Sequence, residues 1–358
     1  MKITFIEPPS LGPKTPERLA GCSYELYHFP DLANYYLMAL FLQNDNAVDY
    51  IDCIAGGFSE NDFLSRLSSN LADCYIIHSV ILSKKTDVAT IQKIRRIAKD
   101  ALIVFHGPEP TRVPEEYLLD EKVLVFRGEP EINLPEFLRS GKRVGMSYLD
   151  KGAVCHEPPS GDLVDVNALP IPARDHESIR AYGLHHSNPK FTKSPYTIMM
   201  ASRGCRFRCL FCVPISISYA RELEYRKYFN KKPPVSVAGA RRVVAEIAEI
   251  HRLGFKSIMI VDDQFLWAKE RTLEICEGIK PLNLEWGFLS RADFLTDPEV
   301  LSALALSGCR SIDIGVESLT QSTLDYVRKD LKTETILRAI ENLKRHGIRA
   351  KLNIMLGT

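Results

Sequence analysis

Three cysteines lie close together in the stretch GCRFRCLFC, at Cys205, Cys209 and Cys212, in a chain of 358 residues with nine cysteines. The stretch follows an apolar run, PYTIMMAS, which predicts a strand, so the cysteines are expected in the loop at its carboxyl end. Thiols separated by three and then two residues suit a metal centre better than chance packing in a core. The spacing therefore predicts a metal site.

The missing fourth cysteine narrows the kind of metal site. Structural zinc sites take four ligands that come mostly in pairs, and the sequence has no second cysteine pair. A zinc site of three cysteines and one histidine remains an alternative. A 4Fe-4S cluster normally takes four thiolates, so three thiolates leave one iron atom with an open coordination position. Catalytic metal sites keep such a position for a substrate or cofactor, which makes catalysis our first interpretation.

The cysteines, together with the aromatic Phe211, match the pattern CxxxCxφC, and the stretch resembles the radical S-adenosylmethionine (SAM) superfamily. The resemblance implies that SAM chelates the open iron through its amino and carboxylate groups. An electron from the cluster then cleaves the sulfonium, and the resulting 5′-deoxyadenosyl radical removes hydrogen from an unactivated carbon. The resemblance also implies a reductant such as flavodoxin or ferredoxin.

Further residues at predicted strand ends fit the SAM-binding positions of that superfamily. The resemblance groups Phe211 and Ser290 with the SAM contacts. It assigns Asp262 and Asp263 to the methionine amino group and Arg291 to the carboxylate. It assigns Glu317 to the ribose, and Asn353 with Met355 to the adenine. Ordinary alternatives exist for several of these residues. The aspartates suit a turn or a helix cap, the arginine a surface salt bridge, and the methionine core packing.

Residues 191–358 alternate predicted strands and helices, and we expect them to form a partial (β/α)6 TIM-like barrel of the radical SAM type. Five strands are predicted. N-cap residues and glycines beyond the last turns mark the helix ends. These residues are, in chain order, Ser236, Gly254, Asp297, Gly308 and Gly347. The sequence stops directly after the fifth strand, so we expect a shortened barrel.

The first 140 residues also alternate β-rich and helical runs. The β-rich runs are apolar at consecutive positions, whereas a sheet with one solvent-exposed face would show alternating apolar and polar residues. This pattern predicts a doubly wound, Rossmann-like α/β domain with a parallel sheet. Ligands of such domains bind outside the carboxyl ends of the strands. Residues 141–190 are rich in Pro, Gly, His and Asp and predict an extended linker.

Short motifs at these strand ends resemble the cobalamin-binding domain of cobalamin-dependent radical enzymes. They are Ser79-Val80-Ile81 for an S-x-L element, Gly107-Pro108 for a G-G element, and Gly128-Glu129 for a G-E-G-E turn. The stretch LPIPARD resembles the segment that joins the two domains in that family. Small residues suit a long nucleotide tail that passes close to the main chain. The resemblance therefore implies bound cobalamin.

The sequence also departs from that family. The D-x-H-x-x-G motif, which supplies a histidine to cobalt in classical corrinoid proteins, is absent. His106 replaces the first glycine of the G-G element and narrows the expected path of the tail. His78 is either a neighbour of cobalt or a strand-end histidine with ordinary partners. The alternative is that the amino-terminal domain has this fold but binds no cobalamin.

Together these features predict a cobalamin-dependent radical SAM methyltransferase that methylates an unactivated carbon. A radical cyclase or oxidative rearrangement enzyme is the alternative, and a non-catalytic iron–sulfur or zinc-binding protein is a third possibility from another class. The cofactor performs the chemistry in such enzymes, so no catalytic acid or base is named. The substrate, a small molecule or a protein, is not readable from the sequence.

Composition excludes several classes of partner. A formal charge of +1 and a pI near 7.6 predict no nucleic-acid or membrane binding. Neither a secretory leader nor an apolar run long enough to span a bilayer is found, so we expect a cytoplasmic protein. An odd number of cysteines in that compartment argues against a disulfide framework. The scattered cysteines are predicted to be small buried residues: Cys22, Cys53, Cys74, Cys155, Cys276 and Cys309.

Overall fold

The structure, a computed structural model, describes residues 1–21, 23–183 and 186–357. Its internal contacts divide the chain into two compact units. The first unit contains Met1–Gly183 and Ile215–Pro233, and the second contains Leu184–Pro214 and Pro234–Thr358. The chain therefore enters the second unit, returns to the first for one helix directly after the cysteine loop, and then completes the second.

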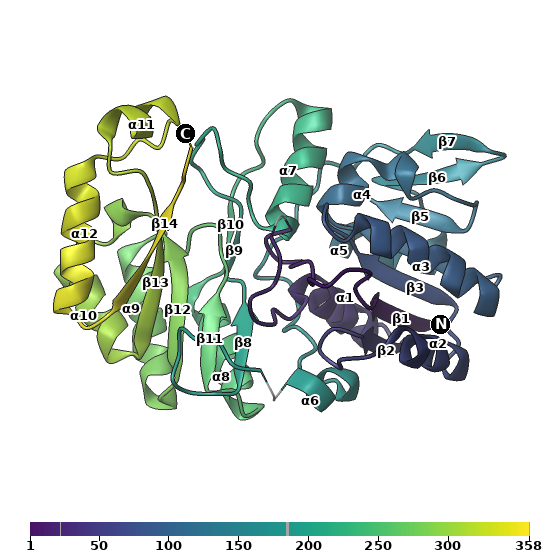
Figure 1. The fold of residues 1–358 in the computed structure, drawn as a ribbon, viewed down its shortest axis with the longest axis horizontal. Helices are drawn as coiled ribbons and strands as arrows, with labels where there is room; N and C mark the ends of the chain where they lie inside the picture. The colour runs from purple at the N-terminus through teal and green to yellow at the C-terminus, as the bar shows by residue number, and fades with distance from the viewer. Residues whose placement is uncertain (22, 184–185, 358) are drawn as a thin grey trace. The chain divides into compact units, whose positions relative to one another are not determined.

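The first unit is built on a seven-stranded sheet with the order β2-β1-β3-β4-β5-β6-β7 (Figure 1). Its strands are β1 (Lys2–Glu7), β2 (Ala47–Asp52), β3 (Cys74–His78), β4 (Leu102–His106), β5 (Val123–Phe126), β6 (Met146–Asp150) and β7 (Ala153–His156). Strands β1 to β5 are parallel. The order 2-1-3-4-5 is that of doubly wound domains whose ligands bind where the strand order reverses, here between β1 and β3. The predicted fold class is confirmed.

Helices cover both faces of this sheet. They are α1 (Leu32–Gln43), α2 (Glu60–Ser69), α3 (Lys84–Ile97), α4 (Pro108–Arg112), α5 (Pro130–Ser140), α6 (Glu177–Gly183) and α7 (Ser216–Phe229), with a 3-10 turn at Pro114–Glu116. Successive strand residues face opposite sides of a sheet. Ile6 accordingly joins a buried cluster with Phe63 of α2 and Ile91 of α3. Phe5 instead contacts Phe41 of α1, with ring centroids 6.2 Å apart.

A β-hairpin extends the first sheet in the segment for which the sequence predicted an extended linker. Strand β6 pairs antiparallel with β5, and β7 pairs antiparallel with β6. Tyr148 in the hairpin is buried. The hairpin lies within the range 141–190, which also contains the helix α6. Apolar alternation over four or five residues is too short a signal to separate such strands from a linker.

The second unit contains a five-stranded parallel sheet with the order β14-β13-β12-β11-β8 (Figure 1). These strands are β8 (Tyr196–Met199), β11 (Ser257–Ile260), β12 (Glu285–Ser290), β13 (Cys309–Glu317) and β14 (Arg349–Ile354), and a separate two-stranded sheet pairs β9 (Ser202–Arg203) with β10 (Ser236–Val237). Consecutive strands are neighbours, as in a barrel that is wound in one direction. The five predicted strands are all present.

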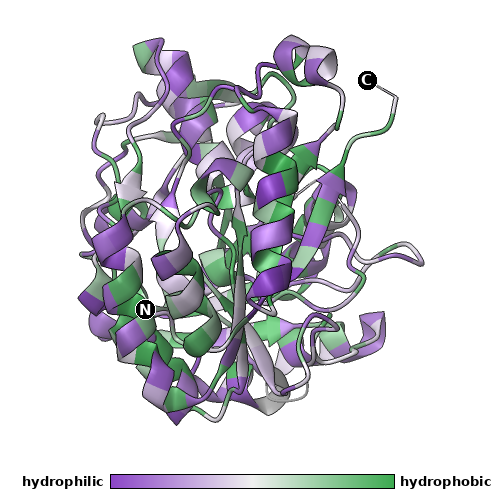
Figure 2. Cartoon of the chain, turned by 90° about the vertical axis from the view of Figure 1, so that its left-hand side faces the viewer, coloured by the Kyte–Doolittle hydropathy of each residue, from purple (hydrophilic) through white to green (hydrophobic). Residues whose placement is uncertain are grey.

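Helices alternate with the strands of the second unit. They are α8 (Ala240–Arg252), α9 (Lys269–Ile279), α10 (Pro298–Leu306), α11 (Gln321–Tyr326) and α12 (Thr333–Arg345), with 3-10 turns at Lys280–Leu282 and Ala292–Phe294. Hydrophilic and hydrophobic residues alternate along them in Figure 2, as helices with one face on a sheet require. This alternation is the pattern on which the helices were predicted.

Most of the predicted helix ends are confirmed. Asp297 caps α10 through its side chain, which accepts from the Glu299 amide at 2.9 Å. The three predicted glycines follow their helices with positive φ, at Gly254, Gly308 and Gly347. The Ser236 prediction is wrong, because that residue lies in β10 and Gly239 is the N-cap of α8. The sequence did not reveal β10, because a strand of two residues is too short to show a periodic pattern.

The scattered cysteines behave largely as predicted. Cys53, Cys74, Cys276 and Cys309 are buried. Cys155 differs from the prediction because it lies half-exposed on β7, at the edge of the first sheet. Cys22 lies outside the described residues. In the described part of the chain, every helix is too short or too polar to cross a bilayer.

Candidate functional site

The three clustered cysteines lie in one loop of the second unit. The loop follows β9, and Gly204, with φ +87°, leads the chain into it. All three residues are thiols, with Cys205 and Cys209 half-buried and Cys212 exposed. The Cys212 amide donates to the Cys209 carbonyl oxygen at 3.3 Å, so the C-x-x-C part closes into a turn. The metal-binding candidates therefore come from one short segment.

The arrangement of these thiols bears on the metal that they fit. Within the described residues, no three His, Cys, Asp or Glu side chains are close enough to share a single metal ion. A zinc ion needs its ligands around one centre. A 4Fe-4S cluster has no such requirement, because each thiolate binds a different iron atom. The assignment of Cys205, Cys209 and Cys212 to a cluster therefore rests on the pattern CxxxCxφC in the sequence.

Asp262 fixes the backbone at the entrance to the cysteine loop. Its side chain, fully buried after β11, accepts hydrogen bonds from the Ala201 amide at 2.6 Å and the Ser202 hydroxyl at 2.7 Å. Burial raises the pKa of Asp262 to about 7, and the hydrogen bonds from Ser202 and Ala201 offset only part of this effect. Asp263, predicted with it as a SAM contact, is half-buried and the more accessible of the two.

Arg291 holds the middle of the loop. Its guanidinium carbon lies 3.7 Å from the centroid of the Phe207 ring, a close cation–π contact. Its nitrogen atoms donate to the Asp293 carboxylate at 3.1 Å and to the Lys329 carbonyl oxygen at 2.8 Å. The sequence suggested that Arg291 binds the methionine carboxylate, whereas here Nε, Nη1 and Nη2 all donate to protein oxygens. These contacts hold Arg291 beside the loop, and its contact with the methionine carboxylate stays a prediction.

Glu317 and Lys329 form a buried ion pair beside the loop. Lys329 Nζ lies 3.0 Å from Glu317 Oε1 and 5.5 Å from the centroid of the Phe211 ring. Glu317 sits at a β-bulge with φ +62°, a conformation that non-glycine residues adopt rarely and mostly where function requires it. The Leu210 amide also donates to the Val327 carbonyl oxygen at 3.0 Å, which ties the loop to the turn before Lys329.

Sequence reasoning missed Lys329. The residue stands in the run VRKD, which reads as a solvated turn between two helices. Nothing in its local spacing distinguishes it from Arg328, which lies next to it in the chain. Only the fold shows that Lys329 is 5% exposed and paired with a predicted ribose contact.

The remaining predicted SAM contacts lie in the same unit and differ in accessibility. Ser290 is buried, and its hydroxyl donates to the Arg291 carbonyl oxygen at 3.0 Å. Asn353 and Met355 lie half-buried at the carboxyl end of β14. The Met355 amide donates to the Glu317 carbonyl oxygen at 2.9 Å, which links the predicted adenine and ribose positions.

Two of the predicted cobalamin residues, Gly107 and Gly128, line a narrow cavity of the first unit. The cavity is also lined by His78 and His106 at the carboxyl ends of β3 and β4, by Pro130 and Glu131 at the start of α5, and by small or apolar side chains of α1 and α7. Gly107 has φ +110°, and a Cβ atom there would lie 2.6 Å from His78 Cδ2 and from the Ser79 carbonyl oxygen. No side chain larger than hydrogen fits at that position.

Two stacked histidines form one wall of this cavity. The His78 and His106 rings lie 4.9 Å apart at an interplanar angle of 14°. His106 Nε2 lies 3.0 Å from the Asn34 side-chain oxygen, and Asn34 Nδ2 donates to Asp31 at 2.9 Å. Burial, together with the charge of His78, holds the pKa of His106 well below its ordinary value. His106 is therefore neutral and donates to Asn34 through Nε2.

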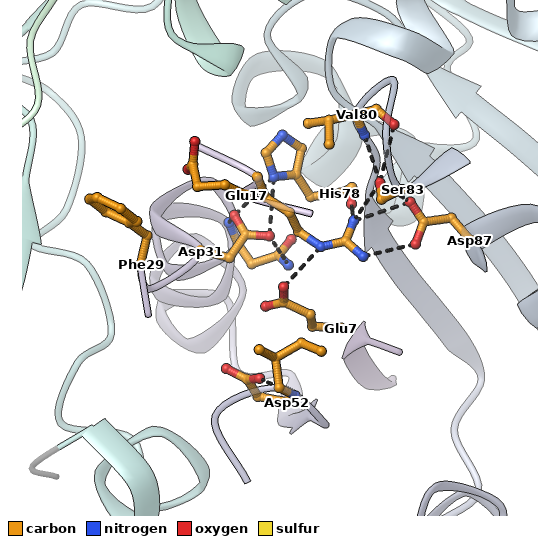
Figure 3. A network of polar contacts seen from close by, with 12 residues as sticks. Glu7, Glu17, Phe29, Asp31, Asp52, His78, Val80, Ser83 and Asp87 are labelled. Carbon is orange, nitrogen blue, oxygen red and sulfur yellow. Dashed lines mark hydrogen bonds and ion pairs between the residues drawn. The ribbon is translucent and has the colours of Figure 1, made fainter. Parts of the chain in front are cut away.

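The buried carboxylate of Asp31 orients the His78 ring. His78 Nδ1 lies 2.9 Å from Asp31 Oδ1, and Figure 3 shows the other ring nitrogen directed away from this contact. Burial alone would raise the pKa of Asp31, but His78, through its charge and its hydrogen bond, and the charge of Arg18 lower it. Arg18 continues the network with a 2.9 Å ion pair to Asp87.

The other predicted cobalamin residues have different surroundings. Ser79 is buried, with its hydroxyl 2.9 Å from the Tyr117 hydroxyl, and Val80 is also buried. Ile81 is 55% exposed, so the S-x-L-like element points only partly into the fold. Pro108 is the first residue of α4.

Glu129, from the turn RGEPE, anchors α7 to the first unit. Its carboxylate lies 3.2 Å from Arg221 Nε of α7. A second buried pair joins Arg127 to Glu224 of the same helix at 3.0 Å. Burial raises the pKa of Glu224, and Arg127 offsets part of that shift. The helix that follows Cys212 in the chain is thus fixed to the first unit by two reciprocal ion pairs.

Comparison with known proteins supports this arrangement. Residues 199–358 match the model of the Radical SAM superfamily. The chain is 26% identical over 370 residues to an uncharacterized methyltransferase of Pyrococcus horikoshii, which covers 100% of this chain and 74% of that protein. It is 25% identical over 329 residues to the anaerobic magnesium-protoporphyrin IX monomethyl ester cyclase of Rubrivivax gelatinosus, covering 87% of this chain and 55% of the cyclase.

Two solved structures share the fold. OxsB, a cobalamin-dependent SAM radical enzyme solved with aqua-cobalamin and SAM, superposes with a TM-score of 0.79 at 19% identity, covering 99% of this chain and 49% of OxsB. TsrM from Kitasatospora setae, a radical SAM methyltransferase, gives a TM-score of 0.70 at 13% identity, covering 98% of this chain and 67% of TsrM. The chain thus spans about half the length of OxsB and of the cyclase.

A radical SAM domain implies a 4Fe-4S cluster and SAM, and the cysteine loop described above is in the part of the chain that matches the superfamily. Residues 199–358 therefore form a radical SAM domain, in a chain with the fold of the cobalamin-dependent radical SAM enzymes.

Proposed function

We propose that the protein is a radical SAM methyltransferase that uses cobalamin to methylate an unactivated carbon. One observation carries the proposal: three thiols in one anchored loop, with a buried Glu317–Lys329 pair beside the aromatic residue of the motif. When bound, the cluster supplies an electron that cleaves SAM, and the adenosyl radical formed removes hydrogen from the substrate. Cys205, Cys209 and Cys212 hold that cluster.

The chain's own side chains position SAM. Lys329 offers an ammonium group to the methionine carboxylate, a charge-assisted contact of the stronger kind. Glu317 accepts hydrogen bonds from the ribose hydroxyls, because a carboxylate is a good acceptor for hydroxyl groups. Asp263 accepts from the methionine amino group. Asp262 and Arg291 act through the loop, because their polar atoms already bond to protein. Ser290 and Asn353 complete the site at the ends of β12 and β14.

The first unit binds cobalamin in this proposal. OxsB has been solved with cobalamin bound, and this chain shares its fold over both units. The strand ends at β3 to β5 support the assignment, because Gly107 and Gly128 carry no side chain there and would let a ligand approach the main chain closely. Methylation follows from the similarity to the Pyrococcus methyltransferase and to TsrM. A flavodoxin or ferredoxin of the cytoplasm, where free thiols persist, supplies the electrons.

A radical cyclase is the second candidate. The similarity to the Rubrivivax cyclase extends over 87% of this chain and favours it specifically. Both reactions begin with hydrogen removal by the adenosyl radical. They differ in the fate of the substrate radical, which gains a methyl group in one case and closes a ring in the other.

An anaerobic assay tests the proposal. The chain is purified without oxygen, its cluster is reconstituted, and it is incubated with cobalamin, a low-potential reductant and SAM carrying a deuterated methyl group. We expect 5′-deoxyadenosine to form and a corrin absorbance band to remain with the protein after desalting. In a host lacking the gene, mass spectrometry should reveal a compound without one methyl group, and adding the enzyme should transfer the deuterated methyl. A zinc-loaded protein that forms no 5′-deoxyadenosine contradicts the proposal, and ring closure without methyl transfer favours the cyclase.

A further inference from the structure

The cysteine loop carries two arginines on its outer surface. Arg206 and Arg208 alternate with the cysteines and are exposed, as is Cys212. Residues 203–213 include no Asp or Glu, although the whole chain has 46 basic and 45 acidic residues. The loop that is proposed to hold the cluster is therefore a basic surface on a nearly neutral chain.

The turn that joins α11 to α12 adds cations beside the loop (Figure 1). The Leu210 amide donates to the Val327 carbonyl oxygen at 3.0 Å, so the turn lies against the loop. Arg328 and Lys332 of the turn are exposed, and so is Asp330. The loop and the turn together expose four basic side chains and one acidic side chain.

The four cations keep their charge available to a partner. Within the part of the chain that the structure describes, none of them forms an ion pair with a carboxylate. Arg206 is held by aromatic rings instead, with its guanidinium carbon 5.2 Å from the centroid of Phe207 and 5.5 Å from that of Phe294. A charged side chain that is already held in place loses less entropy when a partner binds.

Two exposed apolar side chains of the loop accompany these cations. Leu210 is 59% exposed and Val213 is 52% exposed. Complexes between electron-transfer proteins are small and bury less than about 1,200 Å² in total, so one loop and one turn are enough to form such an interface. Cations at its rim mainly raise the rate of encounter with an acidic partner, by about 10- to 1,000-fold.

We propose that the cysteine loop and this turn form the docking surface for an acidic electron carrier of the flavodoxin type. The four cations attract its carboxylates, and Leu210 and Val213 pack on the apolar edge of its flavin. This inference rests on the proposed function, because a cluster in the loop is the electron acceptor. Each productive encounter oxidises the flavin hydroquinone to the semiquinone by one electron, which the cluster takes up, and no proton moves. The arginines position the carrier and take no part in the chemistry.

The experiment uses the full chain, reconstituted with its cluster without oxygen and supplied with SAM. Flavodoxin hydroquinone is mixed with it in a stopped-flow instrument, and the absorbance of the semiquinone reports electron transfer. We expect the wild-type rate to fall as salt is raised, because salt screens surface charges. In the double variant Arg206→Glu with Arg208→Glu, the rate at low salt should be at least about tenfold lower and should no longer fall with salt.

A second reductant and a second variant are the controls. Reduced methyl viologen is a small cation that needs no docking surface, so with it the double variant should form 5′-deoxyadenosine at no less than the wild-type rate. Lys344→Glu with Arg345→Glu makes the same change of charge at the last turn of α12. That turn leads into the amino end of β14, whereas the cysteine loop lies beyond the carboxyl end of β8. This variant should accept electrons from flavodoxin as fast as the wild type.

Three results would overturn the inference. The first is an unchanged rate with flavodoxin in Arg206→Glu with Arg208→Glu. The second is an equal loss with both reductants, because the arginines would then act on the cluster itself. The third is faster reduction of the wild type by an acidic ferredoxin than by flavodoxin. If the wild type forms no 5′-deoxyadenosine even with methyl viologen, the proposed function fails along with the inference, whereas formation with methyl viologen but not with flavodoxin overturns the inference alone.

Discussion

Lys329 Nζ lies 3.0 Å from Glu317 Oε1, both side chains are buried, and the ammonium group lies 5.5 Å from the centroid of the Phe211 ring. A buried ion pair adds little net stability, and residues at a strained φ cluster at active and ligand sites, so the pair is a candidate for ligand binding. The proposed SAM site needs a cation for the methionine carboxylate, which Lys329 supplies. It also needs an acceptor for the ribose hydroxyls, which Glu317 supplies. The pair is the part of the site that only the fold could reveal.

Substituting Lys329 tests this assignment. Lys329→Met removes the ammonium group while keeping most of the apolar stem. We expect the affinity for SAM to fall by about 10- to 100-fold, the size of a charge-assisted hydrogen bond, with iron content unchanged. Equilibrium binding of radiolabelled SAM to the reconstituted protein measures this. Lys332→Met, at an exposed position nearby, is the control and should bind normally. Equal affinities in the two variants would refute the role.

The cysteine loop can be tested through its iron content. Cys209→Ala should abolish the 4Fe-4S absorbance after anaerobic reconstitution, because a cubane held by two thiolates has lost a required ligand. Formation of 5′-deoxyadenosine should cease with it. Cys155→Ser changes a half-exposed cysteine of β7 and should keep full iron content and SAM cleavage. If Cys209→Ala still cleaved SAM, the cluster assignment would be wrong.

The raised pKa of Asp262, about 7 in the folded protein, predicts a pH-dependent stability. A carboxyl group whose folded pKa lies above its unfolded value of 3.8 stabilises the protein at low pH, and this stabilisation is lost as pH rises toward 7. The loss amounts to at most about 4 kcal/mol. Asp262→Asn should remove this slope between about pH 4 and pH 7.

Tryptophan fluorescence can follow that effect, because both tryptophans, Trp267 and Trp286, belong to the second unit. Urea unfolding is compared at the two pH limits for the wild type and Asp262→Asn. Using the difference between the two proteins cancels the contribution of every other titrating group. Parallel pH profiles would show that Asp262 is ionised throughout, contrary to the expectation.

The narrow cavity in the first unit predicts a strict requirement for glycine at position 107. Gly107→Ala forces a Cβ atom to within 2.6 Å of His78 and Ser79. Affinity for cobalamin should fall at least about tenfold, because the added methyl group displaces the His78 ring and the main chain at these strand ends, and such overpacking costs about 1–3 kcal/mol. Gly141→Ala is the matched control, since Gly141 also has positive φ but open space around it. Both variants should lose about 1–3 kcal/mol of stability from backbone strain. Comparable cobalamin affinities in the two would count against this requirement.

The buried pair of Arg127 and Glu224 makes a stability prediction for α7. Arg127→Met leaves the Glu224 carboxylate buried without its partner and should cost about 3–5 kcal/mol in the free energy of unfolding. The double variant Arg127→Met with Glu224→Met should recover most of this loss, because no charge then remains buried. Circular dichroism during denaturant unfolding gives both values. If the double variant is as unstable as the single one, the loss of stability does not come from an unpaired buried charge.

The sequence alone determined the features that depend on local spacing. The three cysteines and Phe211 follow one another in the chain, so their pattern is complete without the fold. Apolar runs predict strands such as β11 and β12. Asp297 predicts a helix start because its side chain accepts a hydrogen bond, and Gly308 predicts a helix end because glycine adopts positive φ easily. The doubly wound class follows from the same alternation. These signals are local, because each depends only on the residues of one short segment and on which of them avoid water.

Only the tertiary structure decided which side chains meet across the chain. His78 and Asp31 are 47 positions apart, and Arg291 and Lys329 are 38 apart, so no periodicity links them. The fold brought Arg291 against the Phe207 ring and paired Lys329 with Glu317, and neither contact was predicted from the sequence. It also placed α7 in the first unit. Hydrogen bonds and ion pairs depend on distances of a few ångströms, which the packing of whole strands and helices sets and no single segment encodes.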